Sequence, residues 1–238
     1  MLLVAMLLSG CATTSSQVPS DPIEPVNRAI FKFNEKADRY VTKPIAQIYD
    51  RVLPSFVRTG VRNFFNNLGD VVVVTNDLLQ LKFTNASRDL VRLVSNTVFG
   101  GLGLVDVAGM RGLTKRQEDF GQTLAYWGVG SGPYLVLPLL GPSTLRDSVG
   151  LVVDSRIDPI WQVPDVPVRN TLTGVNLVDA RANVLPAEKL LEQQPDRYSF
   201  LREAYFQRRR NLIYDGNPPV DPNADLEDPG EGAIDDPE

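Results

Sequence analysis

The sequence contains no histidine and only one cysteine, Cys11, among its 238 residues. Histidine is the commonest general base and the commonest zinc ligand, so its absence excludes the usual histidine-based hydrolases and zinc centres. A single cysteine cannot form an intramolecular disulfide. The chain also lacks a P-loop, a complete G-x-G-x-x-G fingerprint and a G-x-S-x-G elbow. We therefore expect no metal, no cofactor and a protein that is not an enzyme.

Two groups of charged residues are weak candidates for chemistry. Asp147, Asp154 and Asp158 lie close in the sequence and leave a paired-carboxylate hydrolase open, although buried or helix-capping aspartates explain them better. The three arginines at 208–210 are a candidate for contacting phosphate. The favoured interpretation is a solvated helix face that complements the C-terminal helix dipole. This run is short and has no aromatic platform beside it, so no nucleic-acid partner is expected.

The sequence also lacks an uninterrupted apolar run of transmembrane length. Residues 120–145 carry no charge, and roughly 20 apolar residues suffice to cross a bilayer as a helix. Glycines and prolines cut this stretch into short pieces, at Gly128, Gly130, Gly132, Pro133, Pro138, Gly141 and Pro142. Broken backbone is tolerated at membrane depth only where it lines a cavity or packs on protein.

Two interpretations of this stretch follow. One is a re-entrant hairpin with a half-helix at 119–127, a glycine turn and a return over 134–140. The other is a buried loop and strand of a soluble core, and periodicity does not decide between them. Tyr126, Trp127 and Tyr134 carry the same ambiguity, because such rings suit both a membrane interface and an ordinary core.

The N-terminus carries a lipobox. An apolar run that is too short for a transmembrane helix ends in Leu-Ser-Gly-Cys at residues 8–11. Removal of residues 1–10 as a signal peptide leaves Cys11 to be acylated, and each buried CH₂ group contributes about 0.8 kcal/mol to membrane anchoring. Residues 11–20 then form a lipidated tether. Ala12, in place of the Asp that commonly retains lipoproteins at the inner membrane, favours the outer membrane.

One feature departs from the lipobox pattern. No basic residue precedes the apolar run, which points to a start assigned too late or to a truncated sequence. The alternative to lipidation is an ordinary signal peptide followed by a chance cysteine.

The C-terminal segment 217–238 carries eight acidic residues, no basic residue and several prolines, a composition that predicts a disordered acidic tail. Nine acidic residues lie after Tyr214, so the net charge of −5 for the whole chain becomes +4 for residues 1–214. A mildly basic body suits anionic phosphate groups, although ordinary surface charge is the favoured explanation of this number.

The residues between the two ends are enough for one substantial domain. Apolar residues recur at helical spacing through most of it. This periodicity, with prolines and capping residues, predicts helices over 21–41, 44–53, 56–68, 70–81, 84–99, 143–153, 168–184, 186–193 and 196–214. The expected caps include Asp70 for 70–81, Thr84 or Asn85 for 84–99, and Ser143 or Thr144 for 143–153. A strand that starts at the β-branched residues 71–74 is the alternative to the helix at 70–81. Residues 154–167 are predicted to be irregular. Eleven of the eighteen glycines fall between Gly100 and Gly150, so that half of the domain requires tight turns or close backbone approach.

A set of motifs occurs in fixed order between residues 21 and 216. The first contains Asp21, Pro22, Glu24, Asn27, Arg28, Phe33 and Asn34. The others are DFGQTL at 119–124, GVGSGPY at 128–134, LP at 137–138, GPS at 141–143, LRD at 145–147 and REAYFQRR at 202–209. In this combination the chain resembles the MlaA (VacJ) family of lipoproteins.

The resemblance implies an all-α, single ring-shaped domain of amphipathic helices, over residues 21–216, lying in the outer membrane and facing the periplasm. It implies a central amphipathic channel that removes phospholipids from the outer leaflet and passes them to a periplasmic lipid carrier. It also implies association with trimeric porins. A ring of amphipathic helices lying in the membrane plane needs no 20-residue span.

The apolar hairpin is a candidate gate of that channel. This hypothesis rests on glycine placement, with 128–133 and 138–142 as two hinges. The candidate residues are Gly128, Gly130, Gly132, Pro133, Tyr134, Leu137, Pro138, Gly141 and Pro142. Two other functions stay open: an adaptor lipoprotein that scaffolds porins without conducting lipid, and a periplasmic hydrolase acting on lipid.

Overall fold

The computed structural model describes residues 21–219. Cys11, the tether and the tail from residue 220 onward lie outside the described residues, so lipidation and the acidic tail stay predictions. The all-helical class is confirmed: helices make up most of the described chain, and the sheet found there is a single two-stranded hairpin.

The first three helices show where prolines and buried charges override simple sequence signals. Helix α1 (Glu24–Ala37) continues through a π-helical turn, η2 (Asp38–Thr42), into α2 (Lys43–Val52). Helix α3 (Ser55–Leu79) is a single helix of 25 residues, so the two separate helices predicted at 56–68 and 70–81 are wrong. Asp70, the predicted cap of the second, is instead buried within α3 and paired with cations.

The other elements follow in chain order. They are α4 (Phe83–Phe99), α5 (Val107–Met110), α6 (Phe120–Tyr126), β1 (Tyr134–Leu137), β2 (Gly141–Thr144), α7 (Leu145–Ile157), η3 (Pro159–Gln162), α8 (Val166–Val184), η4 (Leu185–Ala187), α9 (Glu188–Glu192) and α10 (Arg197–Ile213). Thr144 caps α7 as predicted, because its side chain accepts a hydrogen bond from the N–H of Asp147. The predicted cap of α4 at 84–85 is wrong, since that helix already begins at Phe83.

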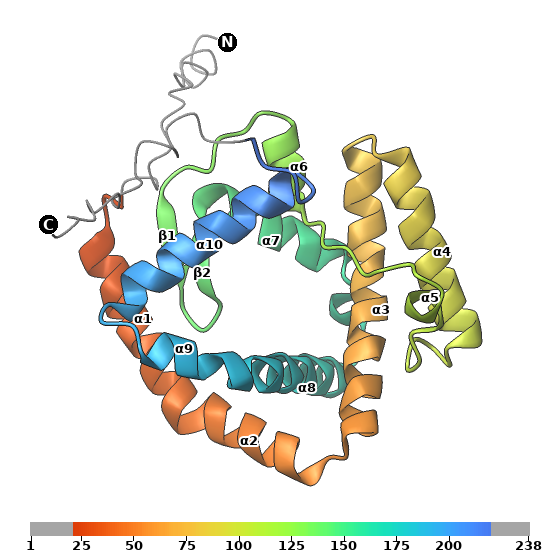
Figure 1. The fold of residues 1–238 in the computed structure, drawn as a ribbon, viewed down its shortest axis with the longest axis horizontal. Helices are drawn as coiled ribbons and strands as arrows, with labels where there is room; N and C mark the ends of the chain where they lie inside the picture. The colour runs from red at the N-terminus through yellow and green to blue at the C-terminus, as the bar shows by residue number, and fades with distance from the viewer. Residues whose placement is uncertain (1–20, 220–238) are drawn as a thin grey trace, which may run out of the picture.

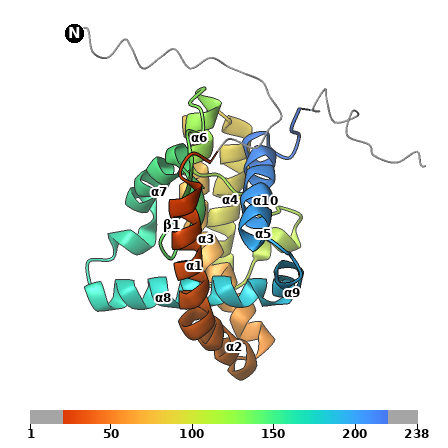
Figure 2. The same cartoon turned by 90° about the vertical axis from the view of Figure 1, so that its left-hand side faces the viewer.

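The elements follow a circuit in the view of Figure 1. Helix α3 forms one side, α8 and α9 a second and α1 a third, while α10, the β-hairpin and α7 complete it. Helices α4 and α5 lie outside the circuit, against the far side of α3. In Figure 2, α8 crosses the direction followed by α1, α4 and α10. Whether the circuit encloses a passage wide enough for lipid stays a prediction.

The helix pair α3–α4 has a polar interior and an apolar exterior. Most of its buried side chains are amides or charges: Asn67, Asp70, Asn76, Asp77, Asp89, Arg92 and Asn96. The exposed side chains of α4 include Leu90, Val91, Val94, Val98 and Phe99. In water this arrangement is unfavourable for two reasons. The buried ions lose their hydration, and the exposed apolar side chains stay in contact with water. Among the described helices, none combines the length and apolar character needed to cross a bilayer.

Cations neutralise the buried carboxylate at the middle of α3. Lys115, from the segment between α5 and α6, contacts Asp70 directly, and Arg92 Nε lies 3.3 Å from Asp70 Oδ2. Arg92 also donates to Asp106 Oδ2 at 3.0 Å. Two cations therefore balance two acids, and the buried charges cross-link α3, α4 and the start of α5.

Among its buried carboxylates the neighbouring cluster holds one more acid than base, and Lys82 also pairs with the exposed Asp215 at 2.6 Å. Arg116 pairs with Asp77 at 2.7 Å and lies 3.5 Å from Asp89, while Lys82 lies 3.3 Å from Glu118. Three carboxylate oxygens, Oδ2 of Asp77 and both of Asp89, are buried without a hydrogen-bond partner. Burial raises the pKa of Asp77 to about 7, against the attraction of Arg116. A proton on Asp77, donated to Asp89, balances the excess buried charge and gives two of these three oxygens a hydrogen-bond partner.

We predict that this proton makes stability depend on pH. The folded state keeps a proton on Asp77 that the unfolded chain releases above about pH 4, so the free energy of unfolding falls as pH rises from about 4 to about 8. Asp77→Asn keeps an acceptor for Arg116 and supplies a donor toward Asp89. It should flatten this dependence and raise stability at about pH 8, measured by thermal unfolding in detergent.

Glu203→Gln is the matched control, since Glu203 is exposed and forms no ion pair with the described residues. Its pH profile should match that of the unsubstituted chain. Equal pH dependence for Asp77→Asn and the control would contradict the shared proton.

Candidate functional site

The uncharged stretch folds into a short helix followed by a β-hairpin. Helix α6 matches the predicted half-helix, and its cap is Asp119, whose Oδ1 accepts from the N–H of Gln122 at 2.9 Å. The chain then returns as β1, which pairs antiparallel with β2 from Tyr134↔Thr144 to Leu137↔Gly141. The hinge proposed at 138–142 is therefore the hairpin turn together with the start of β2.

Two asparagines of α1 bind the backbone of β1 and of the turn that follows it. Asn27 donates to Tyr134 O at 3.0 Å and accepts from Val136 N at 2.9 Å. Asn34 donates to Leu137 O at 2.9 Å and accepts from Leu139 N at 2.8 Å. Seven helical residues rise about 10.5 Å, and three strand residues span about 10 Å. The i, i+7 spacing of the two amides thus matches the strand, and this asparagine clamp fixes the hairpin to α1.

Tyr134 is a core residue. Its side chain is only 1 % exposed, and its ring centroid lies 5.6–6.1 Å from those of Tyr198, Tyr205 and Phe206. The membrane-interface interpretation is therefore wrong for this residue. Tyr126 and Trp127 are half exposed, and for them that interpretation stays a prediction.

The rest of the first motif ties α1 to α10. Asp21 accepts hydrogen bonds from Asn27 Nδ2 at 2.8 Å and from the hydroxyl of Tyr198. Arg28 lies 4.3 Å from the centre of the Tyr198 ring and pairs with Asp196, the cap of α10, at 2.8 Å. Glu24 holds the same guanidinium at 2.6 Å. Pro22 precedes the first turn of α1, and Phe33 is an exposed apolar side chain.

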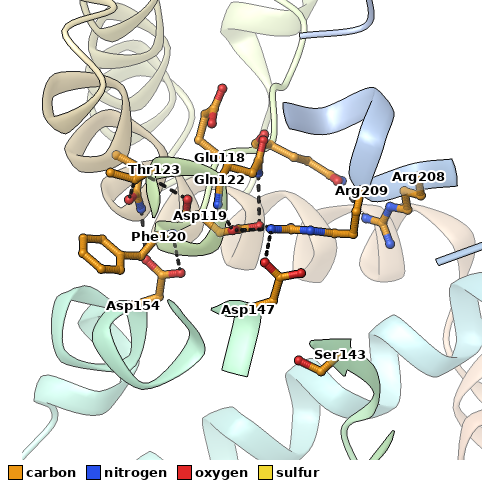
Figure 3. Close-up of polar contacts among 12 residues, drawn as sticks. Glu118, Asp119, Phe120, Gln122, Thr123, Ser143, Asp147, Asp154, Arg208 and Arg209 are labelled. Atoms are coloured by element: carbon orange, nitrogen blue, oxygen red, sulfur yellow. Dashed lines mark hydrogen bonds and ion pairs between the residues drawn. The ribbon is translucent and has the colours of Figure 1, made fainter. Parts of the chain in front are cut away.

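A buried ion cluster joins α6, α7 and α10. Arg209 donates from Nη1 to Asp119 Oδ2 at 2.5 Å and from Nη2 to Asp147 Oδ1 at 2.9 Å, as Figure 3 shows. Asp147 also accepts from Arg146 Nε at 3.0 Å and from the hydroxyl of Tyr205. The interpretation of residues 208–210 as a solvated helix face is therefore wrong for Arg209. This arginine turns inward because its guanidinium pairs with Asp119 and Asp147.

The cluster shifts the acidity of its members in opposite senses. Burial acts to raise the pKa of Asp119, but the hydrogen bonds from Arg209 and Gln122 hold it below the usual value for an aspartate. The pKa of Tyr205 is raised, first by burial and then by its hydrogen bond to Asp147. At neutral pH Asp119 is therefore an ionised carboxylate beside the guanidinium of Arg209, with Tyr205 as a neutral donor to the cluster.

The other two aspartates of the candidate hydrolase set have structural roles. Asp154 accepts from the N–H of Phe120 and from Asn76 Nδ2, both at 2.9 Å, and burial raises its pKa. Asp158 caps η3 by accepting from the N–H of Ile160 at 2.8 Å. The interpretation of these residues as buried or capping groups is confirmed. Within residues 21–219, no group of three or more acidic residues is arranged to hold a metal ion.

Close packing of α6 on α7 depends on a glycine pair that sequence reasoning missed. A Cβ atom on Gly150 would lie 2.4 Å from Gly121 N, and one on Gly121 would lie 2.5 Å from Asp147 Oδ1. The two helices therefore approach at van der Waals distance and carry the ion cluster at their crossing. The excess of glycine between 100 and 150 was the available signal, but composition does not reveal which pairs touch.

The glycines of the candidate gate are not equivalent. Gly128, Gly132 and Gly141 have positive φ, which L side chains rarely adopt. Gly130 has no positive φ, and a Cβ there would meet open space. The backbone conformation therefore requires glycine at the ends of the expected 128–133 hinge rather than at its centre.

The fold and site define a helical protein with paired charges inside α3–α4, many apolar side chains on its outside and a clamped hairpin on the circuit. The chain belongs to the MlaA lipoprotein family, whose model matches residues 19–212.

Comparisons with known proteins agree with this assignment. The chain is 37% identical over 228 residues to the "Intermembrane phospholipid transport system lipoprotein MlaA" of Shigella flexneri and to that of Escherichia coli (strain K12). Each alignment covers 92% of this chain and 90% of the relative. A solved structure described as "Structural basis for maintenance of bacterial outer membrane lipid asymmetry" matches with a TM-score of 0.73 at 33% identity, covering 84% of this chain and 100% of the other.

The clamp predicts a specific change in hairpin mobility. Asn34→Ala removes two hydrogen bonds at the turn end of the hairpin, each contributing roughly 1 kcal/mol. Exchange of the amide hydrogens of Val136, Leu137 and Leu139 should then accelerate by about tenfold or more, while exchange in α3 stays unchanged. Asn170→Ala, at an exposed position of α8, is the control and should change neither. Unaltered exchange in the hairpin of Asn34→Ala would show that other contacts hold it.

Proposed function

We propose that this protein maintains outer-membrane lipid asymmetry. In this proposal it removes phospholipids from the outer leaflet through a central amphipathic channel and passes them to a periplasmic lipid carrier. The relatives that are named for intermembrane phospholipid transport support the pathway. Their family is one of lipid-transport lipoproteins, so the protein is not an enzyme.

The observation that carries the proposal is the distribution of polar groups in α3–α4, where charges are buried and apolar side chains are exposed. Exposed side chains such as Val98, 64 % exposed, and Phe99, 75 % exposed, need a hydrocarbon environment, whereas the charges behind them are paired. A helix pair of this kind is stable against acyl chains, where buried polar groups must find partners inside the protein. A ring of helices with apolar outer faces is suited to insertion into one leaflet of a bilayer.

The proposed location is the outer membrane, with a lipid anchor at Cys11 and the body facing the periplasm. The lipobox and the residue after it support the anchor and the destination. Association with trimeric porins and with a periplasmic carrier rests on the family resemblance. No energy source is visible in the sequence, so the carrier and later steps would set the direction of transport.

We also propose that the β-hairpin gates the channel. Its tip carries Leu139 and Leu140, which are both exposed and apolar, so they are suited to touch acyl chains. The glycines with positive φ at either side provide backbone that changes conformation easily. The asparagine clamp, through Asn34, holds the gate in the position seen here.

A lipid-content measurement combined with a locked hairpin tests both parts. Protein purified from membranes in mild detergent should carry phospholipid, detected by mass spectrometry. Cysteines replacing Asn34 and Leu139, joined by a short thiol-reactive linker, should raise the phospholipid content of the outer leaflet in cells that depend on this protein. The two single-cysteine variants treated with the same linker are the controls and should keep it low.

The outcomes separate the candidate functions. Absence of bound phospholipid, with asymmetry restored only through porin binding, would favour the adaptor lipoprotein. Unchanged asymmetry in the cross-linked cells, with phospholipid still bound, would contradict the gate and leave transport standing.

A further inference from the structure

A pocket of about 270 Å³ lies where α10 passes the end of α6 and the start of α7. It lies on one side of the ion cluster of Figure 3 and includes three arginines. The residues that form its wall are Ala125, Ser131, Thr144, Arg146, Asp147, Tyr205, Phe206, Arg209, Arg210, Ile213 and Tyr214. Three cations against the single carboxylate of Asp147 give this wall an excess of two positive charges.

A second pocket, of about 250 Å³, lies on the other side of the same cluster. It shares Asp147, Tyr205 and Arg209 with the first, but its remaining charged groups are carboxylates, and leucines of the hairpin and α7 complete it. The ion cluster thus separates a cationic pocket from an apolar and acidic one. An anion is favoured in the first pocket and repelled from the second.

Two arginines of the cationic pocket have N–H groups that make no hydrogen bond to the described residues. Arg146 is only 8 % exposed, and its Nε and Nη1 bind Asp147 and Val129 O at 3.0 and 3.3 Å. Its Nη2 makes no hydrogen bond to the described residues. Arg210 uses Nη2 for Pro219 O at 2.6 Å, which leaves Nη1 and Nε for a ligand. The guanidinium groups of Arg146 and Arg210 both line this pocket and therefore both have N–H donors available for a ligand.

We propose that this cationic pocket binds the phosphate group of a phospholipid, with Arg146 and Arg210 donating to its oxygens. Guanidinium groups match phosphate oxygens in geometry as well as in charge. Phe206 and Ile213 add apolar wall that suits a glycerol backbone better than an inorganic ion. The exposed Leu145, next to Arg146 in the chain, offers apolar surface to an acyl chain leaving the pocket. The proposal rests on the proposed function and names the contacts that would recognise its cargo.

A matched pair of substitutions on one helix tests the site. Arg210→Gln removes a pocket arginine, and Arg208→Gln removes an equally exposed neighbour that donates to Gln117 Oε1 at 2.7 Å outside the pocket. Binding to the full-length protein in non-ionic detergent is measured by calorimetry with three probes: dihexanoylphosphatidylethanolamine, dihexanoylglycerol and inorganic phosphate. We expect Arg210→Gln to weaken phospholipid binding about fivefold or more, and Arg208→Gln to change it by less than about twofold.

Two further measurements identify the bound molecule and distinguish a lost contact from misfolding of the variant. Dihexanoylglycerol, which lacks the phosphate, should bind at least about tenfold more weakly than the phospholipid. Arg146→Lys keeps the charge but not the planar fork, and should weaken phospholipid binding while leaving the melting temperature within a few degrees.

Equal effects of Arg208→Gln and Arg210→Gln, or equal affinity for phospholipid and dihexanoylglycerol, would overturn the site. Inorganic phosphate binding as tightly as the phospholipid would overturn the lipid as its occupant. Phospholipid bound equally by the unsubstituted and Arg210→Gln chains would refute this site and leave the proposed function intact. Failure of every chain to bind phospholipid would count against the proposed function itself.

Discussion

The pairing of buried charges between α3 and α4 is the constraint on which the rest of the structure depends. Carboxylates at Asp70, Asp77 and Asp89 are almost fully buried, and removing one partner of such a cluster typically destabilises a protein by about 3 to 5 kcal/mol. Lys115 and Arg116 reach them from the segment between α5 and α6, so that segment is fixed against α3. With these charges paired inside, the apolar side chains of α4 lie on the outside of the helix pair.

Buried hydrogen bonds also connect α3 to the helix that precedes the hairpin. A chain of hydrogen bonds leads from Gln80 through Thr123 and Asn76 to Asp154, which in turn holds the first N–H of α6. Helix α6 then presents its cap, Asp119, to Arg209 of α10. The polar interior therefore links α3 through α6 to α10. A hairpin clamped by side-chain amides, rather than by a covering sheet, can be released at modest free-energy cost.

Much of this was predictable, and the misses have identifiable causes. Helix positions followed from periodicity and caps, because the helices are amphipathic whichever solvent they face. The break predicted before Asp70 was wrong because a long-range ion pair holds that residue inside a continuous helix. Asn27 and Asn34 were recognisable by their motif, but their contacts lie more than 100 residues away. The burial of Arg209 between its two neighbours depends equally on partners from α6 and α7.

The central proposal is that the apolar surface of α4 faces acyl chains. Photolabelling with a carbene-generating probe dissolved in phospholipid vesicles, read by mass spectrometry residue by residue, tests this claim most directly. The account predicts strong labelling at Leu90, Val94 and Val98 and none at Asp89 or Asn96. Label absent from all of α4 while other exposed helices are modified would contradict it.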